Sequence, residues 1–268
     1  MDVFRELSRN TSIMKKQHIT MLAASVLGAA VANGSLLVHY SFDGGDAANG
    51  GSLNDGTVVG GTAFVDGRSG LAFQGNRTGA NDAYIQTGYS GTELGFGPDS
   101  VYTAMAWVNW DGASGQVDHM VFGQEDGAGN ASQLHHGIRA DSAANVHYGG
   151  WGNDLNDAGT ATPGEWTHLA WSYDGTDKVV FVNGVETARQ NGSTMEGHAL
   201  PVIVGGHGRD AADPAGQSFN GLIDDVKVFS TALDAAGVLA ASQGGAVPEP
   251  SSLGLLALAG LGLLRRRR

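Results

Sequence analysis

The sequence of 268 residues contains no cysteine, which excludes disulfide bonds and any cysteine nucleophile. Basic side chains are scarce as well: 15 Lys and Arg stand against 27 Asp and Glu, and eight of the 15 lie near the chain ends. The middle of the chain is therefore strongly acidic, so we expect it to repel nucleic acid and anionic lipid and to attract cations. Long amphipathic helical patterns and internal repeats are also missing.

Long apolar runs occur only at the two ends. Near the N-terminus, two lysines precede an apolar stretch (19–31) with a small-residue cleavage site after Ala32. This layout predicts a secretory signal peptide in residues 1–32 that signal peptidase removes. The residues before Met14 do not fit such a signal, so we expect translation to start at Met14.

The C-terminal segment (247–268) reads VPEPSSLGLLALAGLGLLRRRR. Its prolines interrupt regular structure, its apolar run predicts a hydrophobic helix that enters the membrane, and its arginines favour the cytoplasmic side. The segment resembles the PEP-CTERM sorting signal of Gram-negative bacteria, which implies recognition and cleavage by an exosortase. An uncleaved tail anchor is the alternative. The two ends predict export through the inner membrane to the cell surface or extracellular matrix, with transient or permanent membrane attachment.

The region between the ends (33–246) predicts one all-β domain. It is rich in glycine, and its short apolar runs alternate with Gly, Asp and Asn clusters, as in many short strands joined by turns. Strands at 166–173, 178–182 and 185–189 form a predicted meander, with a type I′ turn at Asn183-Gly184. The middle strand is apolar on both faces, which favours a two-sheet sandwich.

Other segments fit the same plan. We expect strands at 36–42, 101–110, 201–204 and 219–229, then a short helix within 230–241. Trp107 is expected to anchor the core from its strand.

The motifs VHYSFDGG, VDGRSGLAFQG, TAMAWVNW, GEWTHLAWSYDG and FNGLIDDVKVFSTAL occur in this order. Together they resemble the laminin G-like, concanavalin A-type jelly-roll domain. The resemblance implies a two-sheet antiparallel jelly-roll sandwich across residues 33–246.

This family often carries a structural Ca²⁺ ion that ties the first strand to the last. The positions that match are Asp43 in YSFD and the pair Asp224 and Asp225 in LIDD, and carboxylate oxygens are suitable Ca²⁺ ligands. The alternative is that Asp43 caps a turn and the Asp pair faces water.

Two loops are candidate ligand sites. Glu125 and Asp126 follow an expected strand and resemble, in a different order, the Ca²⁺-dependent ligand loop of pentraxins.

The second loop contains Tyr148, Trp151, Asn153 and Asp154, where aromatic faces and polar groups could form a carbohydrate platform. The alternative is a Trp packed against its own loop.

The histidines show no spacing typical of zinc sites. His135 and His136 are neighbours in an expected strand and should point to opposite faces. We therefore expect them not to share one metal ion.

The sequence favours a non-catalytic module that binds a polysaccharide or matrix glycan, with Ca²⁺ as an expected structural cofactor. A structural matrix protein without a specific ligand is the alternative. A glycoside hydrolase is disfavoured, because such enzymes need two carboxylates near one another and the chain lacks the Glu-x-Asp-x-(x)-Glu pattern by which the related laminarinase and lichenase group places them on one strand.

Overall fold

A computed structural model of the chain describes residues 34–61, 63–75, 83–97, 100–112, 118–125, 133–139, 145–150, 153–192, 200–207 and 218–244. All of them belong to one compact unit, Ala32–Arg268. The predicted signal peptide (1–32) and sorting segment (247–268) lie outside the described residues, so their structure and boundaries stay predictions. Within the described ranges, no helix is both long enough and apolar enough to span a membrane.

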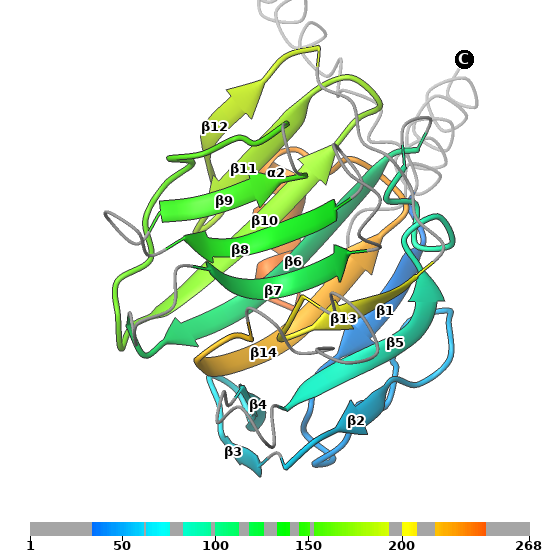
Figure 1. Cartoon of the computed structure of the whole chain (residues 1–268), viewed down its shortest axis with the longest axis vertical. Helices are drawn as coiled ribbons and strands as arrows, with labels where there is room; N and C mark the ends of the chain where they lie inside the picture. The colour runs from blue at the N-terminus through cyan, green and yellow to red at the C-terminus, as the bar shows by residue number, and fades with distance from the viewer. Residues whose placement is uncertain are drawn as a thin grey trace, which may run out of the picture. The chain divides into compact units, whose positions relative to one another are not determined.

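Two antiparallel sheets make up the domain (Figure 1). The eight-stranded sheet contains β1 (Leu36–Tyr40), β3 (Ala63–Asp66), β4 (Leu71–Gly75), β6 (Tyr102–Trp110), β10 (Trp166–Tyr173), β11 (Lys178–Val182), β12 (Val185–Gln190) and β14 (Gly221–Phe229). Its order is β12-β11-β10-β6-β14-β4-β3, and β1 also pairs with β14. The first and last strands of the domain are therefore neighbours.

The second sheet has six strands. They are β2 (Thr57–Val59), β5 (Tyr84–Ser90), β7 (Asp118–Glu125), β8 (Gln133–Arg139), β9 (Asn145–Gly149) and β13 (Pro201–Val204). Their order is β2-β5-β13-β7-β8-β9. The large core lies between the two sheets, where side chains such as Phe73, Ile85, Phe122, Trp171 and Val204 are buried. The predicted all-β two-sheet sandwich is confirmed.

The meander forms as the sequence predicts. Strands β10, β11 and β12 pair in order, and β11 is almost fully buried on both faces. Asn183 and Gly184 have φ of +52° and +79°, which are the positive values that a type I′ turn requires.

A second, smaller core covers the outer face of the eight-stranded sheet. The helix α2 (Ala235–Ser242) packs there through Val238 and Ala241 against Met105, Phe181 and Phe229. The side chain of Asp234 caps the helix by accepting a hydrogen bond from Gly237 N. Both faces of this sheet are therefore covered beneath α2, as the apolar pattern of β11 indicates.

Strand β14 is irregular where the LIDD motif lies. Its register against β6 shifts between Asp224 and Lys227, so that Asp225 and Val226 together lie opposite Ala106. Asp225 has φ +50°, a left-handed conformation that is uncommon for residues other than glycine. Such β-bulges redirect side chains and are frequent beside functional sites.

Candidate functional site

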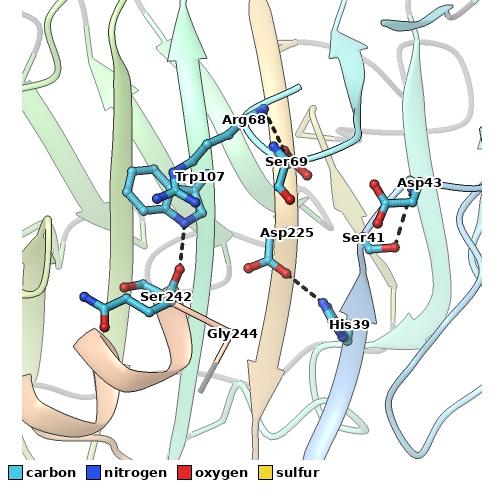
Figure 2. A pocket seen from close by; sticks show the side chains of 11 residues that line it. His39, Ser41, Asp43, Arg68, Ser69, Trp107, Asp225, Ser242 and Gly244 are labelled. Carbon is cyan, nitrogen blue, oxygen red and sulfur yellow. Dashed lines mark hydrogen bonds and ion pairs between the residues drawn. The ribbon is translucent and has the colours of Figure 1, made fainter. Parts of the chain in front are cut away.

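A pocket of about 220 Å³ lies on the outer face of the eight-stranded sheet, between β1, β6, β14 and the end of α2 (Figure 2). Five separate segments of the sequence meet there. The lining residues are His39, Ser41, Asp43, Arg68, Ser69, Trp107, Asp224, Asp225, Ser242, Gln243 and Gly244. The pocket thus brings together all three aspartates that the sequence singled out for a metal.

Trp107 forms the aromatic wall of the pocket. Its neighbours along β6, Ala106 and Val108, face the large core, so alternation turns Trp107 outward and half-buries it. The expected core-anchor role of Trp107 is therefore wrong. The indole Nε1 donates to Ser242 O at 3.1 Å, and the Arg68 guanidinium carbon lies 3.6 Å from a ring centroid (Figure 2). The ring is held in place by this hydrogen bond, and the exposed side chain of Arg68 covers its face.

Asp225 and Lys227 connect three elements of the fold. Asp225 accepts hydrogen bonds from His39 Nε2 on β1 at 2.7 Å and from Lys227 Nζ at 2.6 Å. Lys227 Nζ also donates to Ala241 O in α2 at 2.9 Å. Burial opposes ionisation of Asp225, but the hydrogen bonds from His39 and Lys227 outweigh it and lower the pKa of this carboxyl. The Asp225–Lys227 ion pair therefore links strand β1, strand β14 and helix α2.

Asp224 and Asp43 both hold the turn between β3 and β4. Asp224 Oδ2 accepts from Arg68 N at 3.0 Å and Ser69 N at 3.2 Å, and Asp43 Oδ1 accepts from Leu71 N at 3.1 Å. Burial raises the pKa of Asp224, although these backbone donors act against the shift.

The close approach of Asp43 depends on Gly70. Gly70 has φ +71°, and a Cβ there would lie 1.8 Å from Asp43 Oδ1. Gly70, the second glycine of the motif VDGRSG, is therefore required both for the turn conformation and for this contact.

Donors of the protein already contact all three carboxylates of the predicted Ca²⁺ site. Among the described residues, no group of three or more His, Asp or Glu side chains is arranged to hold a metal ion. Asp225 is already neutralised by the Lys227 ammonium group, which occupies the position of a counter-cation. Binding of Ca²⁺ by Asp43 and Asp224, with backbone carbonyls supplying further oxygens, stays a prediction.

Tyr148 does not lie on a carbohydrate platform. Its side chain is fully buried, its hydroxyl lies 2.6 Å from that of Tyr102, and Lys178 Nζ lies 5.3 Å from its ring centroid. Burial is the main reason that the pKa of Tyr148 is well above its ordinary value. The ring belongs to the core because β9 alternates, with Val146 and Tyr148 facing inward.

The other predicted ligand residues are only partly described. Asn153 and Asp154 are half-buried, and Asn153 O accepts a hydrogen bond from Lys178 Nζ at 2.5 Å. Trp151, Asp126 and the side chain of Glu125 lie outside the described residues, so their roles stay predictions.

Comparison with known proteins agrees with this architecture. A family model of the concanavalin A-like lectin/glucanases superfamily matches residues 77–239. The chain belongs to this superfamily. A second model, for the PEP-CTERM protein-sorting motif, matches residues 246–268, so this superfamily domain is followed by a signal for export sorting. A search of curated proteins finds no match.

Solved structures of similar fold include several binding domains. Domain 4 of AbnA, a GH43 extracellular arabinanase from Geobacillus stearothermophilus, in complex with arabinotriose, has a TM-score of 0.60 at 23% identity, covering 78% of this chain and 98% of that one. The binding domain of Paraclostridial Mosquitocidal Protein 1 has a TM-score of 0.56 at 13% identity, covering 76% and 51%. A structure of botulinum neurotoxin type C, described as dependent on two ganglioside molecules for cell entry, has a TM-score of 0.55 at 8% identity, covering 76% and 50%. This chain spans about half the length of the two toxin chains.

Proposed function

We propose that this protein is an exported, non-catalytic carbohydrate-binding module whose glycan site is the pocket beside Trp107. The observation that carries the proposal is the combination of a fixed indole ring with three carboxylates and an arginine in one pocket. Sugar rings present apolar C–H faces that stack on aromatic rings, and their hydroxyls bond to charged side chains. This pocket supplies both kinds of contact.

The Arg68 side chain covers the Trp107 indole and must move before a sugar can stack on the ring. The side chain is exposed and lies over the Trp107 ring, while the backbone N–H of Arg68 is fixed by Asp224. The guanidinium can therefore swing away without moving the turn and then donate to sugar hydroxyls from the edge of the ring. The apolar C–H face of a sugar would then stack on the indole in place of the guanidinium.

Two further observations support a glycan ligand. The AbnA domain that shares this fold is described as a complex with arabinotriose, and the botulinum neurotoxin structure is described in terms of gangliosides. The sorting motif at 246–268 fits a protein processed by an exosortase and placed at the cell surface or in the extracellular matrix. In that setting an acidic domain would meet polysaccharide.

A hydrolytic role has one observation in its favour. Asp224 and Asp225 lie in the same pocket with pKa values shifted in opposite directions, as in the acid and base of a glycosidase. Both carboxylates, however, are held by donors of the protein itself. Asp225 would have to give up Lys227 and His39 to reach a sugar, so binding without hydrolysis is the better fit.

The test is a glycan array with residues 33–246, which contain every described strand and both cores. The array is run in Ca²⁺ and again in EDTA, followed by titration of the best oligosaccharide. Arg68→Ala and Trp107→Ala should alter affinity, whereas Arg189→Ala, an exposed arginine on β12 paired with Glu186 and outside the pocket, should not. If the domain binds no glycan in either buffer, the protein is better explained as a structural matrix component.

A further inference from the structure

A group of buried histidines lies on the outer face of the six-stranded sheet, away from the Trp107 pocket. Leu134 and Tyr148 belong to the core, so alternation along β8 and β9 turns His135 and His147 to the opposite face. His136 faces the core, where its Nε2 lies 2.9 Å from the Tyr102 hydroxyl, as expected for the neighbour of His135.

Glycines surround these histidines in register. His135 lies between Gly123 on β7 and Gly149 on β9, and His147 lies beside Gly137 on β8. A Cβ at Gly149 would lie 2.2 Å from His147 Nε2 and 2.3 Å from Asp154 Oδ1. Only glycine leaves room for the imidazole and the carboxylate to meet here.

The tautomer of His147 is set by its neighbours. Asn156 Oδ1 accepts from Arg139 Nη1 at 3.4 Å and lies 2.9 Å from His147 Nδ1, so Nδ1 carries the proton and donates it. The lone pair is then on Nε2, which is buried and has no hydrogen-bond partner within the described part of the chain. This is the tautomer in which a histidine binds a metal, with its other nitrogen oriented by an oxygen.

Two electron-pair donors face each other at this point. Nε2 of His147 lies 3.7 Å from Oδ1 of Asp154, and no proton is placed between them. Two ligands of one tetrahedral Zn²⁺ ion, each about 2.0–2.1 Å from the metal, are about 3.4 Å apart. The observed separation is close to that of a metal-bound pair.

His135 and His207 lie on the other side of the same cluster. Their Nε2 atoms are in direct contact, their ring centroids are 4.1 Å apart, and the His135 ring centroid is 6.0 Å from that of His147. All three imidazoles are at least 96% buried. Imidazole nitrogens that converge in a buried position suit Zn²⁺, Ni²⁺ or Cu²⁺ and do not suit Ca²⁺.

We propose that His135, His147, His207 and Asp154 bind one divalent transition-metal ion of the Zn²⁺ class. No three of these donors are positioned around a common point as they stand. Rotation of His135 and His207 away from their mutual contact, toward His147, completes the site. The ion would join β8 and β9 to His207, three residues after the end of β13, and to the segment at Asp154.

The experiment uses residues 33–246 without a histidine tag, after treatment with EDTA. Zn²⁺ is titrated by calorimetry, Co²⁺ by visible absorption, and Ca²⁺ serves as the hard-cation comparison. We expect one Zn²⁺ per chain and a Co²⁺ spectrum of low coordination number, with no competition from Ca²⁺. His147→Gln and His207→Gln should abolish both signals.

Two further variants distinguish a loss of metal binding from a loss of folding. Asn156→Ala changes an exposed residue that orients His147 and also accepts a hydrogen bond from Arg139, and it should weaken Zn²⁺ binding by about 10- to 100-fold while the domain stays folded. His168→Gln, a buried histidine of the eight-stranded sheet, should leave the affinity unchanged. The proposal is overturned if the wild-type domain binds neither Zn²⁺ nor Co²⁺, or if Asn156→Ala and His147→Gln bind as the wild type does.

Discussion

Replacing Lys227 with methionine should destabilise the domain more than any loss of a surface ion pair. Methionine keeps most of the apolar side chain but leaves the Asp225 carboxylate without its cation and Ala241 O without a donor. Removing one partner of a buried pair costs about 3–5 kcal/mol, which we discount to about 1–3 kcal/mol because a quarter of the Asp225 side chain is exposed and His39 still donates to it. The lost hydrogen bond to Ala241 adds about 1 kcal/mol. We therefore expect a loss of about 2–4 kcal/mol.

Urea unfolding at pH 7 measures this cost, and a double-mutant cycle isolates the pair. Asp225→Asn combined with Lys227→Met should cost less than the sum of the single changes, because the double variant leaves no unpaired charge. Arg189→Met is the control, since it removes an exposed pair and should cost less than about 1 kcal/mol.

The pH dependence gives a second readout of the same pair. The pKa of Asp225 is lowered on folding, so its contribution is fully present above its ordinary value of 3.8 and is lost as the pH falls through the folded value. The cost of Lys227→Met should shrink accordingly in acid. Additive single variants, or a cost below about 0.5 kcal/mol at pH 7, would show that Asp225 and Lys227 do not form a stabilising pair.

Three further predictions concern cations, acid and catalysis. Ca²⁺ should raise the melting temperature of the EDTA-treated domain if Asp43 is a ligand. The variant Asp43→Asn should then abolish this rise, whereas Asp225→Asn should retain it. A melting temperature that does not change when Ca²⁺ is added excludes the calcium site. Burial lowers the pKa of His168 to about 3, so its contribution to the free energy of unfolding should be fully present above pH 6.5 and should fall by about 1.4 kcal/mol per pH unit toward pH 3. The variant His168→Gln, measured in EDTA, should make the loss of stability with falling pH less steep. An unchanged slope contradicts the lowered pKa of His168. Incubation with a bound oligosaccharide should release no reducing ends; release that disappears in Asp224→Asn would instead identify a hydrolase.

The fold was predictable because its signals are local. Asn183-Gly184 can adopt the two positive φ values of a tight hairpin, and the apolar faces of 178–182 require cover on both sides. The short helix also follows from local signals, with Asp234 as its cap. None of these inferences needed a contact between distant residues.

The pocket was predictable only in part. Resemblance to a family pointed to Asp43, Asp224 and Asp225, and the structure does bring them together. The bulge at Asp225 has no signature in the sequence, so the pairing of its carboxylate with Lys227 could not be foreseen.

Two other outcomes depended on long-range register. The sequence predicts Trp107 as a core residue because both of its neighbours are apolar, and only the burial of Ala106 and Val108 in the large core shows that Trp107 faces outward. His135, His147 and His207 are up to 72 residues apart, and no spacing rule connects them. Their proximity follows from the order of β13, β7, β8 and β9 in the second sheet.

Glycan binding in the pocket beside Trp107 is the proposal on which the function depends. The most direct measurement is calorimetric titration of residues 33–246 with the best oligosaccharide from the array, comparing wild type with Trp107→Ala and Arg189→Ala. We predict saturable binding that Trp107→Ala weakens at least tenfold, which corresponds to about 1.4 kcal/mol, and that Arg189→Ala leaves unchanged. Saturable binding that survives loss of the indole in a folded domain would contradict it.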